Sequence, residues 1–421
     1  MSPIGNRGRA RPSPVSRVTT LPRTLSDPAR PRYPPFLVAS DLSNTIRYLR
    51  DFVAIPSVNP MGTDAVPAEH AGERRYAEHV AERLRRIGLD TALVGTGERI
   101  SVVAEARVRA ATETVLIASH LDTVPVEAME IDPFDPRIAD GRLYGRGSCD
   151  TKSGMASALA AIERLLERGG LRRNVILVGE ADEEATSLGV EDVLAHLAAR
   201  RPDWALATEP TGLELVTHHK GVGRAELRAT GIACHSSHPS LGRSAIVQIS
   251  KAVLALEHLG ARLAQRSDPL LGPGTLSVGL IGGGQAANIV PPDAWLHLDR
   301  RLLPGEDLAS MRAEIEEALA MADLDDVRIT TLSVEKPALG TGADSAAVRA
   351  CSKAIEAIGR DASPAIAAFG TDAGLFSSHG IDSVVFGPGQ IAQAHTAAEF
   401  VEIDQVEAAT NFFEYLLGSA D

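Results

Sequence analysis

Short apolar runs alternate with longer amphipathic segments along most of the chain. The runs at 114–118, 174–178, 204–207 and 384–386 consist mainly of Val, Ile, Leu, Ala and Phe, which is typical of strands buried on both faces. Positions 42, 46, 49 and 53 are apolar at helical spacing, and positions 155, 159, 162 and 166 form a second such face. Buried strands alternating with helices predict an α/β fold on an open sheet.

The pattern changes between residues 215 and 336. Strands are expected at 222–229, 275–280, 294–300 and 327–332, and helices at 245–263 and 308–321. The order βαββαβ predicts a ferredoxin-like unit, in which helices cover a small antiparallel sheet. Polar motifs of the larger fold stand before and after this unit. Residues 215–336 are therefore expected to be inserted into one domain made of residues 39–214 and 337–421.

The N-terminal segment differs from the rest. Its first 35 residues contain seven Arg, eight Pro and one acid, Asp27, and no apolar stretch of the length of a secretory signal or a membrane span. We expect residues 1–38 to be a disordered extension. A transit peptide and translation from an unused upstream start codon are alternatives, although the many prolines fit the amphipathic helix of a transit peptide poorly.

Composition limits the classes of partner. The 421 residues are 44% hydrophobic and 23% charged, enough for two domains with substantial cores. A net charge of −13 and 4% aromatic residues argue against nucleic acid and against an anionic membrane as partners. The three cysteines, Cys149, Cys234 and Cys351, form no CxxC pair, which favours a reducing, cytoplasmic location.

Five potential metal ligands stand at corresponding places of the predicted fold. Four of them follow the apolar runs in turn, and one precedes the helix that contains Met155; they are His120, Glu184, Glu209, His395 and Asp150. Because open α/β sheets bind ligands at the carboxyl ends of their strands, these side chains are expected to converge. Imidazole and carboxylate together suit hard and borderline divalent cations.

Each candidate also has a purely structural interpretation. His120 and Asp122, in SHLDTVP, fit an ordinary loop, and Asp150 alone is better explained as a helix cap. In a metal site, Asp122 would accept the ring N–H of His120, and Asp150 would bridge two cations about 3.5–4 Å apart. Glu183 and Glu184 point in different directions, so that one can be a ligand and the other a proton shuttle. The two-metal hypothesis accounts for all the candidates at once.

The chain resembles the M20 metallopeptidase and deacylase family over about residues 40–418. Seven motifs occur in the family's order: SHLDTVP, GRGSCDTKSG, ADEE, ATEP, CHSSHPSLGRSAI, DRRLLPGE and FGPG followed by AHTAAE. Ser153 departs from the glycine that is more frequent in the family, outside the ligand set. The resemblance implies a three-layer catalytic domain, with helices on both faces of a mixed, mostly parallel sheet, and an inserted ferredoxin-like lid that also forms a homodimer.

The resemblance also implies a di-metal site. One ion would be held by His120 and Glu209, the other by Glu184 and His395, and Asp150 would bridge them. Two Zn²⁺ are expected, with Co²⁺ or Mn²⁺ as alternatives. In a hydrolase of this kind, a water between the ions attacks an amide carbonyl.

Further roles follow from the same resemblance. Glu183 would be the general base, and Asp122 would orient His120. His235 would stabilise the oxyanion, reaching the site of the partner subunit; a surface loop is the alternative for this histidine.

Three residues are expected to bind the substrate. They are Asn288, Arg301 and Gly387, with Arg300 as an alternative to Arg301 because both arginines could fork around a carboxylate. The phrases ACHSSHPSLG and FGPGQIAQAHTAAEFVEI are most similar to acetylornithine deacetylases, so removal of the acyl group from an N-acyl amino acid is the first expectation. Succinyl-diaminopimelate desuccinylase comes second, and a carboxypeptidase or dipeptidase acting on short peptides third.

Overall fold

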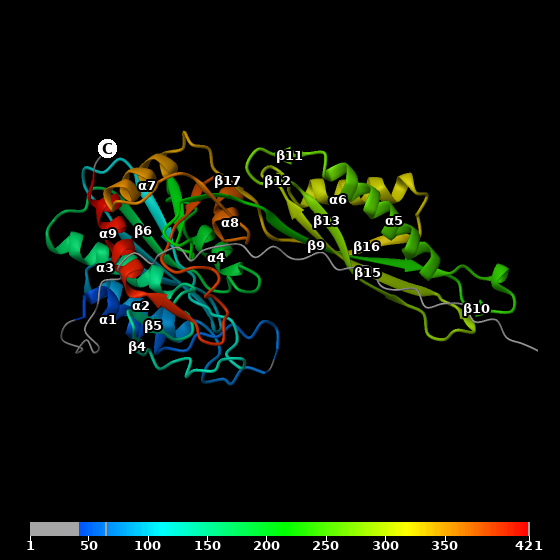
Figure 1. Cartoon of the computed structure of the whole chain (residues 1–421), viewed down its shortest axis with the longest axis horizontal. Coiled ribbons are helices and arrows are strands. Elements are labelled where there is room, and N and C mark those ends of the chain that lie inside the picture. Colours follow the sequence, from blue (N-terminus) through cyan, green and yellow to red (C-terminus); the bar gives the residue numbers. More distant parts are fainter. Residues whose placement is uncertain (1–41, 64, 420–421) are drawn as a thin grey trace, which may run out of the picture. The chain divides into compact units, whose positions relative to one another are not determined.

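A computed structural model describes residues 42–63 and 65–419 of the chain (Figure 1). The expected disordered extension at residues 1–38 lies outside the described residues. Most strands belong either to a nine-stranded mixed sheet or to a four-stranded antiparallel sheet. Among the described helices, none has the length and apolar character needed to cross a membrane.

The nine-stranded sheet is parallel at its centre and largely antiparallel at its flanks. In order across the sheet, its strands are β1 (Asp90–Thr96), β2 (Arg99–Ala106), β6 (Asn174–Gly179), β3 (Thr114–Ala118), β7 (Trp204–Ala207), β19 (Asp382–Val385), β8 (Val216–His219) and β17 (Leu339–Gly340), with β18 (Ala365–Ala367) beside β8. The central strands are buried on both faces, as their unbroken apolar runs predict.

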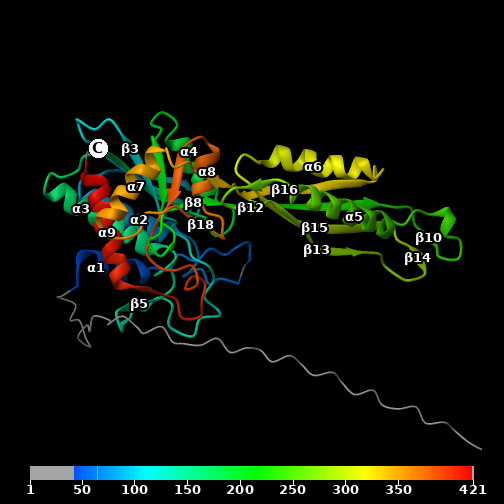
Figure 2. The same ribbon diagram turned by 45° about the horizontal axis from the view of Figure 1, so that its top comes forward.

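Helices cover both faces of this sheet (Figures 1 and 2). One face packs against α1 (Asn44–Val53), α2 (Arg74–Arg86), α3 (Lys152–Glu167), α7 (Ala346–Ala357) and α9 (Ile403–Gly418). The other face packs against α4 (Leu188–His196) and α8 (Ala373–Ser378). The four apolar positions predicted for the first helix are all buried, Leu42 just before α1 and Ile46, Leu49 and Val53 within it. The predicted three-layer α/β arrangement is confirmed.

Strand direction determines where the polar motifs meet. β6, β3, β7 and β19 are parallel neighbours, so their carboxyl ends lie along one edge of the sheet. Asp150 reaches the same edge on the turn between β5 (Arg142–Tyr144) and α3. β5 itself lies in a three-stranded sheet with β4 (Ile138–Ala139) and β20 (Phe400–Glu402).

The four-stranded sheet has the order β13 (Thr275–Gly283), β15 (Asp293–Leu302), β9 (Gly221–Thr230) and β16 (Val327–Lys336). The helices α5 (Ala245–Leu263) and α6 (Leu308–Met321) bury their apolar faces against it. All of its pairings are antiparallel, which with the order βαββαβ gives the predicted ferredoxin-like arrangement.

Two short strand pairs at its ends were not predicted. β10 (Cys234–His235) pairs with β14 (Ile289–Val290), and β11 (Ser267–Asp268) pairs with β12 (Gly272–Pro273). They lie at opposite ends of the four-stranded sheet (Figures 1 and 2). The chain enters and leaves this sheet where Val222 pairs with Lys336, which we call the root of the sheet.

Candidate metal centre

The five predicted ligands converge around Asp150. Its Oδ1 lies 2.9 Å from Nε2 of His120, and its Oδ2 lies 3.3 Å from Nε2 of His395. His120 Nε2 is also 3.9 Å from Glu209 Oε2, and His395 Nε2 is 3.1 Å from Glu184 Oε1. Asp150 thus turns one carboxylate oxygen to each histidine.

The geometry defines two groups that could each hold a metal ion. The first is His120, Asp150 and Glu209, and the second is Asp150, Glu184 and His395, with the ligand atoms of each group within 4.8 Å of one another. The resemblance to the M20 family implies the same grouping. Imidazole nitrogen and carboxylate oxygen are donors that fit a divalent cation such as Zn²⁺.

The electrostatics of the cluster favour a cation. Burial raises the pKa values of Glu209 and Glu184, so bringing their negative charges together is costly without positive charge nearby. Burial opposes ionisation of Asp150 too, yet hydrogen bonds from His120 and His395 hold the pKa of this carboxyl below its usual range. Three carboxylates and two imidazole rings face one another here, and divalent cations would balance the negative charge.

Asp150 is held in place through its main chain. The fully buried carboxylate of Glu399 accepts the N–H groups of Cys149 and Asp150, at 2.9 and 3.1 Å, and pairs with Arg146 at 2.6 Å. The N-cap of α3 is Thr151, so the alternative of Asp150 as that cap is wrong. Its carboxylate remains available to the two histidines.

Asp122 lies behind the cluster and joins two of its strands. The nearest acceptor for His120 Nδ1 is the backbone oxygen of Asp122 at 3.0 Å, with the carboxylate Oδ1 at 3.5 Å. The carboxylate also accepts the main-chain N–H groups of Glu183 and Glu184, each at 3.0 Å, and the Asn59 amide at 2.9 Å. With Nδ1 bonded in this way, Nε2 of His120 is free to face a metal.

Glu183 lies beside the cluster in a chemically different setting. Burial raises its pKa to about 7, against the lowering effect of the neighbouring Lys336 ammonium. It lines a cavity of about 510 Å³ together with Glu184, Arg224 and Arg301, the arginines coming from β9 and β15. A carboxylate with a pKa near neutrality at the wall of a cavity suits proton transfer.

The substrate-binding candidates lie in different surroundings. Arg301 reaches the cavity and bonds Asp299 at 2.9 Å, whereas Arg300 is 1% exposed and paired with Glu306, which leaves the exposed arginine as the better carboxylate partner. Gly387 is buried, and a Cβ there would lie 2.5 Å from the backbone oxygen of Glu209.

His235 and Asn288 come together at the β10–β14 pair. His235 is opposite Ile289, and Ser236 N donates to the Asn288 backbone oxygen at 3.0 Å. In the described ranges, no hydrogen bond or ion pair joins either residue to the metal cluster of the same chain. β9 runs from the root towards this end over ten residues, about 33 Å.

Three residues of the site were not assigned a role from the sequence. Asn59 bonds both Asp122 and Asp182, Glu399 holds the main chain at Asp150, and Lys336 contacts Glu183. Asn59 and Lys336 are single polar residues without a recognisable spacing to the motifs. Glu399 stands in the last motif, four residues after His395, and this position was its signal.

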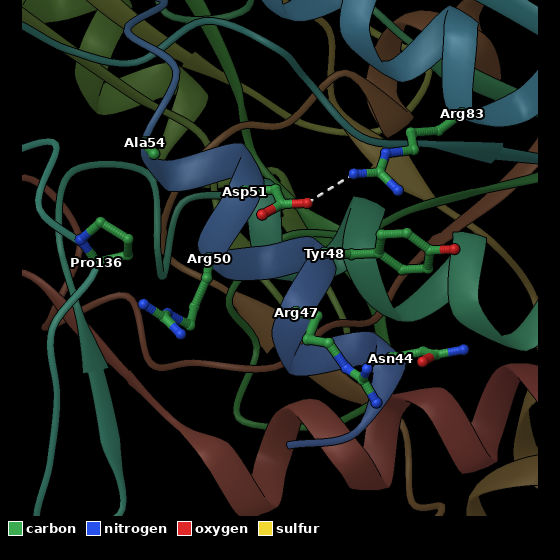
Figure 3. Close-up of a pocket in the computed structure, with 8 residues that line it drawn as sticks. All are labelled: Asn44, Arg47, Tyr48, Arg50, Asp51, Ala54, Arg83 and Pro136. Atoms are coloured by element: carbon green, nitrogen blue, oxygen red, sulfur yellow. Dashed lines mark hydrogen bonds and ion pairs between the residues drawn. The ribbon is translucent and has the colours of Figure 1, made fainter. Parts of the chain in front are cut away.

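A second cavity of about 500 Å³ lies along α1 (Figure 3). Arg47 and Arg50 line it, and Asp51 pairs with Arg83 at 2.8 Å. None of the predicted site residues is among those that line this cavity. The cavity bordered by Glu183 is therefore the one connected with the candidate metal centre.

The site groups carboxylate and imidazole donors about one aspartate and has a separate glutamate beside them. This arrangement is typical of a metal-dependent hydrolase. The chain belongs to the peptidase family M20/M25/M40, whose sequence profile matches residues 116–419. It is a metal-dependent hydrolase of amide bonds.

Relatives and solved structures agree with this assignment. The chain is 32% identical to an acetylornithine deacetylase of Myxococcus xanthus, over 69% of this chain and 76% of the relative. It is 28% identical to a succinyl-diaminopimelate desuccinylase of Corynebacterium glutamicum, over 87% of this chain and 97% of the relative. Its fold is similar to that of the M20 family metallo-carboxypeptidase Sso-CP2 of Sulfolobus solfataricus, with a TM-score of 0.71, 23% identity and coverage of 90% and 99%.

Proposed function

We propose that this chain is a two-metal hydrolase that removes the acyl group from an N-acyl amino acid. The observation that carries the proposal is the division of the Asp150 carboxylate between two groups of ligands. His120 and Glu209 would hold one divalent ion, with zinc as the proposed metal, and Glu184 and His395 would hold the other. Similarity to an acetylornithine deacetylase supports an acyl amino acid as substrate.

The protein residues supply proton transfer and orientation. Two divalent ions held by these residues would supply a water of lowered pKa and would polarise the amide carbonyl. Glu183 removes a proton from the attacking water and delivers it to the leaving amine, for which a pKa near 7 is well matched. Asp122 holds His120 and the main chain of Glu183 in fixed positions during both proton transfers.

Residues 215–336 would form a lid that also makes a homodimer. The distance along β9 supports this role, because His235 lies at the end of the four-stranded sheet opposite its root, where Lys336 reaches Glu183. His235 would therefore serve the site of a second chain. Its Nδ1 accepts the Ser237 N–H at 3.1 Å, which leaves an Nε2–H to donate to a developing oxyanion.

Arg301 and Asn288 would bind the substrate. Arg301 projects from β15 into the cavity that Glu183 and Glu184 border, and its planar guanidinium suits the α-carboxylate of an amino acid. Asn288 accompanies His235 at the β10–β14 pair and would enter the site with it. Gly387, packed against the Glu209 carbonyl, would contribute main chain close to the ligands.

Desuccinylation of an N-succinyl amino acid is the second candidate. The relative with that activity matches 97% of its own length, more than the 76% of the deacetylase. Three free cysteines support a reducing, cytoplasmic location for either activity.

A hydrolysis screen with defined metal content tests the proposal. The metal-free chain is loaded with Zn²⁺, Co²⁺ or Mn²⁺ and assayed with N-acetylornithine, N-succinyl-diaminopimelate, other N-acyl amino acids and dipeptides. We expect release of the free amino acid from an acyl amino acid only with metal. Cleavage of dipeptides alone would replace the deacylase assignment by a peptidase assignment.

A further inference from the structure

Lys336 is enclosed by acceptors from two separate segments of the larger fold, residues 183–187 and Asp372. Its ammonium donates to the backbone oxygen of Glu183 at 2.9 Å, to Ser187 Oγ at 2.6 Å and to Asp372 Oδ1 at 2.7 Å, and it also contacts Glu183 Oε1. Its side chain is only 14% exposed. An ammonium has only three N–H groups, so these four acceptor atoms more than fill its capacity.

Two of these acceptors fix the ammonium independently of the Glu183 side chain. Asp372 is fully buried at the start of α8, and its Oδ1 also accepts the Ser187 hydroxyl at 2.7 Å. Ser187 precedes α4 and is itself buried. The Lys336 charge is therefore a fixed point to which the Glu183 carboxylate is docked.

Glu183 is consequently held at two places. Its main-chain N–H donates to Asp122 at 3.0 Å, and its Oε1 contacts Lys336. No described residue makes a hydrogen bond to Oε2. A flexible carboxylate held at one oxygen keeps the other free for a reacting water, which is the arrangement a general base requires.

Lys336 is also the last residue of β16, at the root of the four-stranded sheet. It pairs with Val222, and the register of β16 against β9 shifts between Val334 and Lys336. Such irregularities redirect a side chain out of the alternation of a strand, and they are frequent beside active sites. Here the shift ends at the residue whose ammonium reaches Glu183.

We propose that Lys336 is a positioning residue for Glu183. It holds one oxygen of the carboxylate so that the other faces the metal cluster, and it links the geometry of the base to the root of the lid. This inference rests on the proposed role of Glu183 as general base. Lys336 belongs to neither group of ligands; it borders the same cavity as Glu183 and acts through Glu183.

The first test compares Lys336→Met with a matched control, Lys220→Met. Lys220 lies at the other crossing of the root, and its ammonium donates to the Pro273 backbone oxygen. We expect kcat of K336M to fall about 10²-fold or more, with KM within roughly threefold of wild type and metal content unchanged. K220M should keep the wild-type kcat. An unchanged kcat in K336M would overturn the inference.

The second test separates positioning from a general loss of structure. If Lys336 acts only through Glu183, adding K336M to Glu183→Gln should leave the residual rate of E183Q unchanged, because the coupled residues are not additive. A crystal structure of K336M should show the Glu183 carboxylate turned away and the five ligands in place. A further loss of rate in the double variant, or an unmoved Glu183, would contradict the inference.

A charge-balanced variant covers the case in which K336M does not fold. Combining K336M with Asp372→Asn removes both buried charges, and D372N alone is its reference. The double variant should lose kcat relative to D372N without a change of KM; equal kcat would overturn the inference. If E183Q itself keeps wild-type turnover, the proposed base is wrong, which is a different result from an inactive E183Q with an active K336M.

Discussion

Asp122 connects the two sides of the candidate site through its own atoms. It offers a backbone oxygen to His120 and carboxylate oxygens to the main chain at Glu183 and Glu184. Asp122→Ala should loosen the main chain at Glu183 and Glu184 and the orientation of His120. We expect metal affinity to fall about 10–100-fold. A competition assay with a chelating dye measures the change. An unaltered metal affinity would show that other contacts hold the main chain at Glu183 and Glu184.

Glu183 separates proton transfer from metal binding. Glu183→Gln keeps the shape of the side chain and removes its basicity. We expect two metal ions per chain as in wild type and a kcat lower by about 10²–10⁴-fold. Steady-state kinetics alongside metal analysis checks both halves of this expectation. Wild-type kcat would rule out Glu183 as the base.

His219, which is not a proposed metal ligand, should make the free energy of unfolding depend on pH. It is fully buried between Thr371 and the Lys220 carbonyl, and burial lowers its pKa from the usual 6.5 to about 4. The unfolded chain therefore binds the proton first as pH falls, so stability present above pH 6.5 is lost between about 6.5 and 4. The loss amounts to about 3 kcal/mol.

His219→Gln should remove this loss. Denaturant unfolding at several pH values measures it, and the slope of the unfolding free energy against pH should flatten in H219Q. The exposed His379→Gln is the control that should keep the slope. Identical slopes in wild type and H219Q would mean that another group titrates.

The ligands were predictable because each stands next to a strong local pattern. His120, Glu184 and Glu209 follow buried apolar runs, and parallel strands must end at one edge. Lys336 and Asn59 were not predictable, because folding brings each of them to the site from a distant part of the sequence. Lys336 lies 153 residues from Glu183 in the sequence, and nothing near it marks the contact.

At the level of elements, the approach of α3 to the end of β7 sets the spacing of the site. Asp150 precedes α3 and Glu209 follows β7, and the two segments touch at Gly154, where a Cβ would lie 2.1 Å from Thr208 Oγ1. The Thr151 hydroxyl also donates to the Thr208 backbone oxygen. Glycine at this position therefore lets the two ligands come close together.

Gly154→Ala should separate the two elements. We expect a loss of about 1–3 kcal/mol of unfolding free energy and weaker metal binding, because the clash involves backbone-anchored atoms. Gly260→Ala is the matched control within α5, where a Cβ would meet its nearest atom at 3.5 Å. That variant should be neutral or more stable, because alanine favours helix. Equal stability of G154A and wild type would refute the packing argument.

Element bounds were predicted best where the ends carry local signals. The helices at 245–263 and 308–321 match the structure, with the side chains of Ser244 and Asp307 capping their first turns. The β10–β14 pair was not predicted, because each strand has only two residues and the partners are more than 50 positions apart. Apolar periodicity needs a longer segment to be recognised.

For the whole molecule, the four-stranded sheet leaves apolar surface at one edge. Leu280 and Ile281 on its edge strand β13, and Val247 and Leu254 on α5, are between 51% and 59% exposed. An unpaired edge with apolar residues is a typical surface for association with a second copy. This surface supports the proposed homodimer.

Disrupting that surface should give monomers. Leu254→Asp combined with Leu280→Asp should halve the mass found by sedimentation, whereas Leu270→Asp, also exposed but next to β11, should leave the dimer intact.

If His235 serves the partner's site, mixed H235A and E183Q chains should regain activity that neither has alone. A monomeric wild-type chain with full activity would contradict both the dimer and the shared site.

The number of metal ions bound per chain is the decisive measurement for the two-metal site. Calorimetric titration of the metal-free wild-type chain with Zn²⁺ should end at two ions per chain. Asp150→Ala should lose tight binding at both positions, because Asp150 belongs to both groups of ligands. A wild-type chain that binds one ion or none, or a D150A variant that still binds two, would rule out a site divided about Asp150.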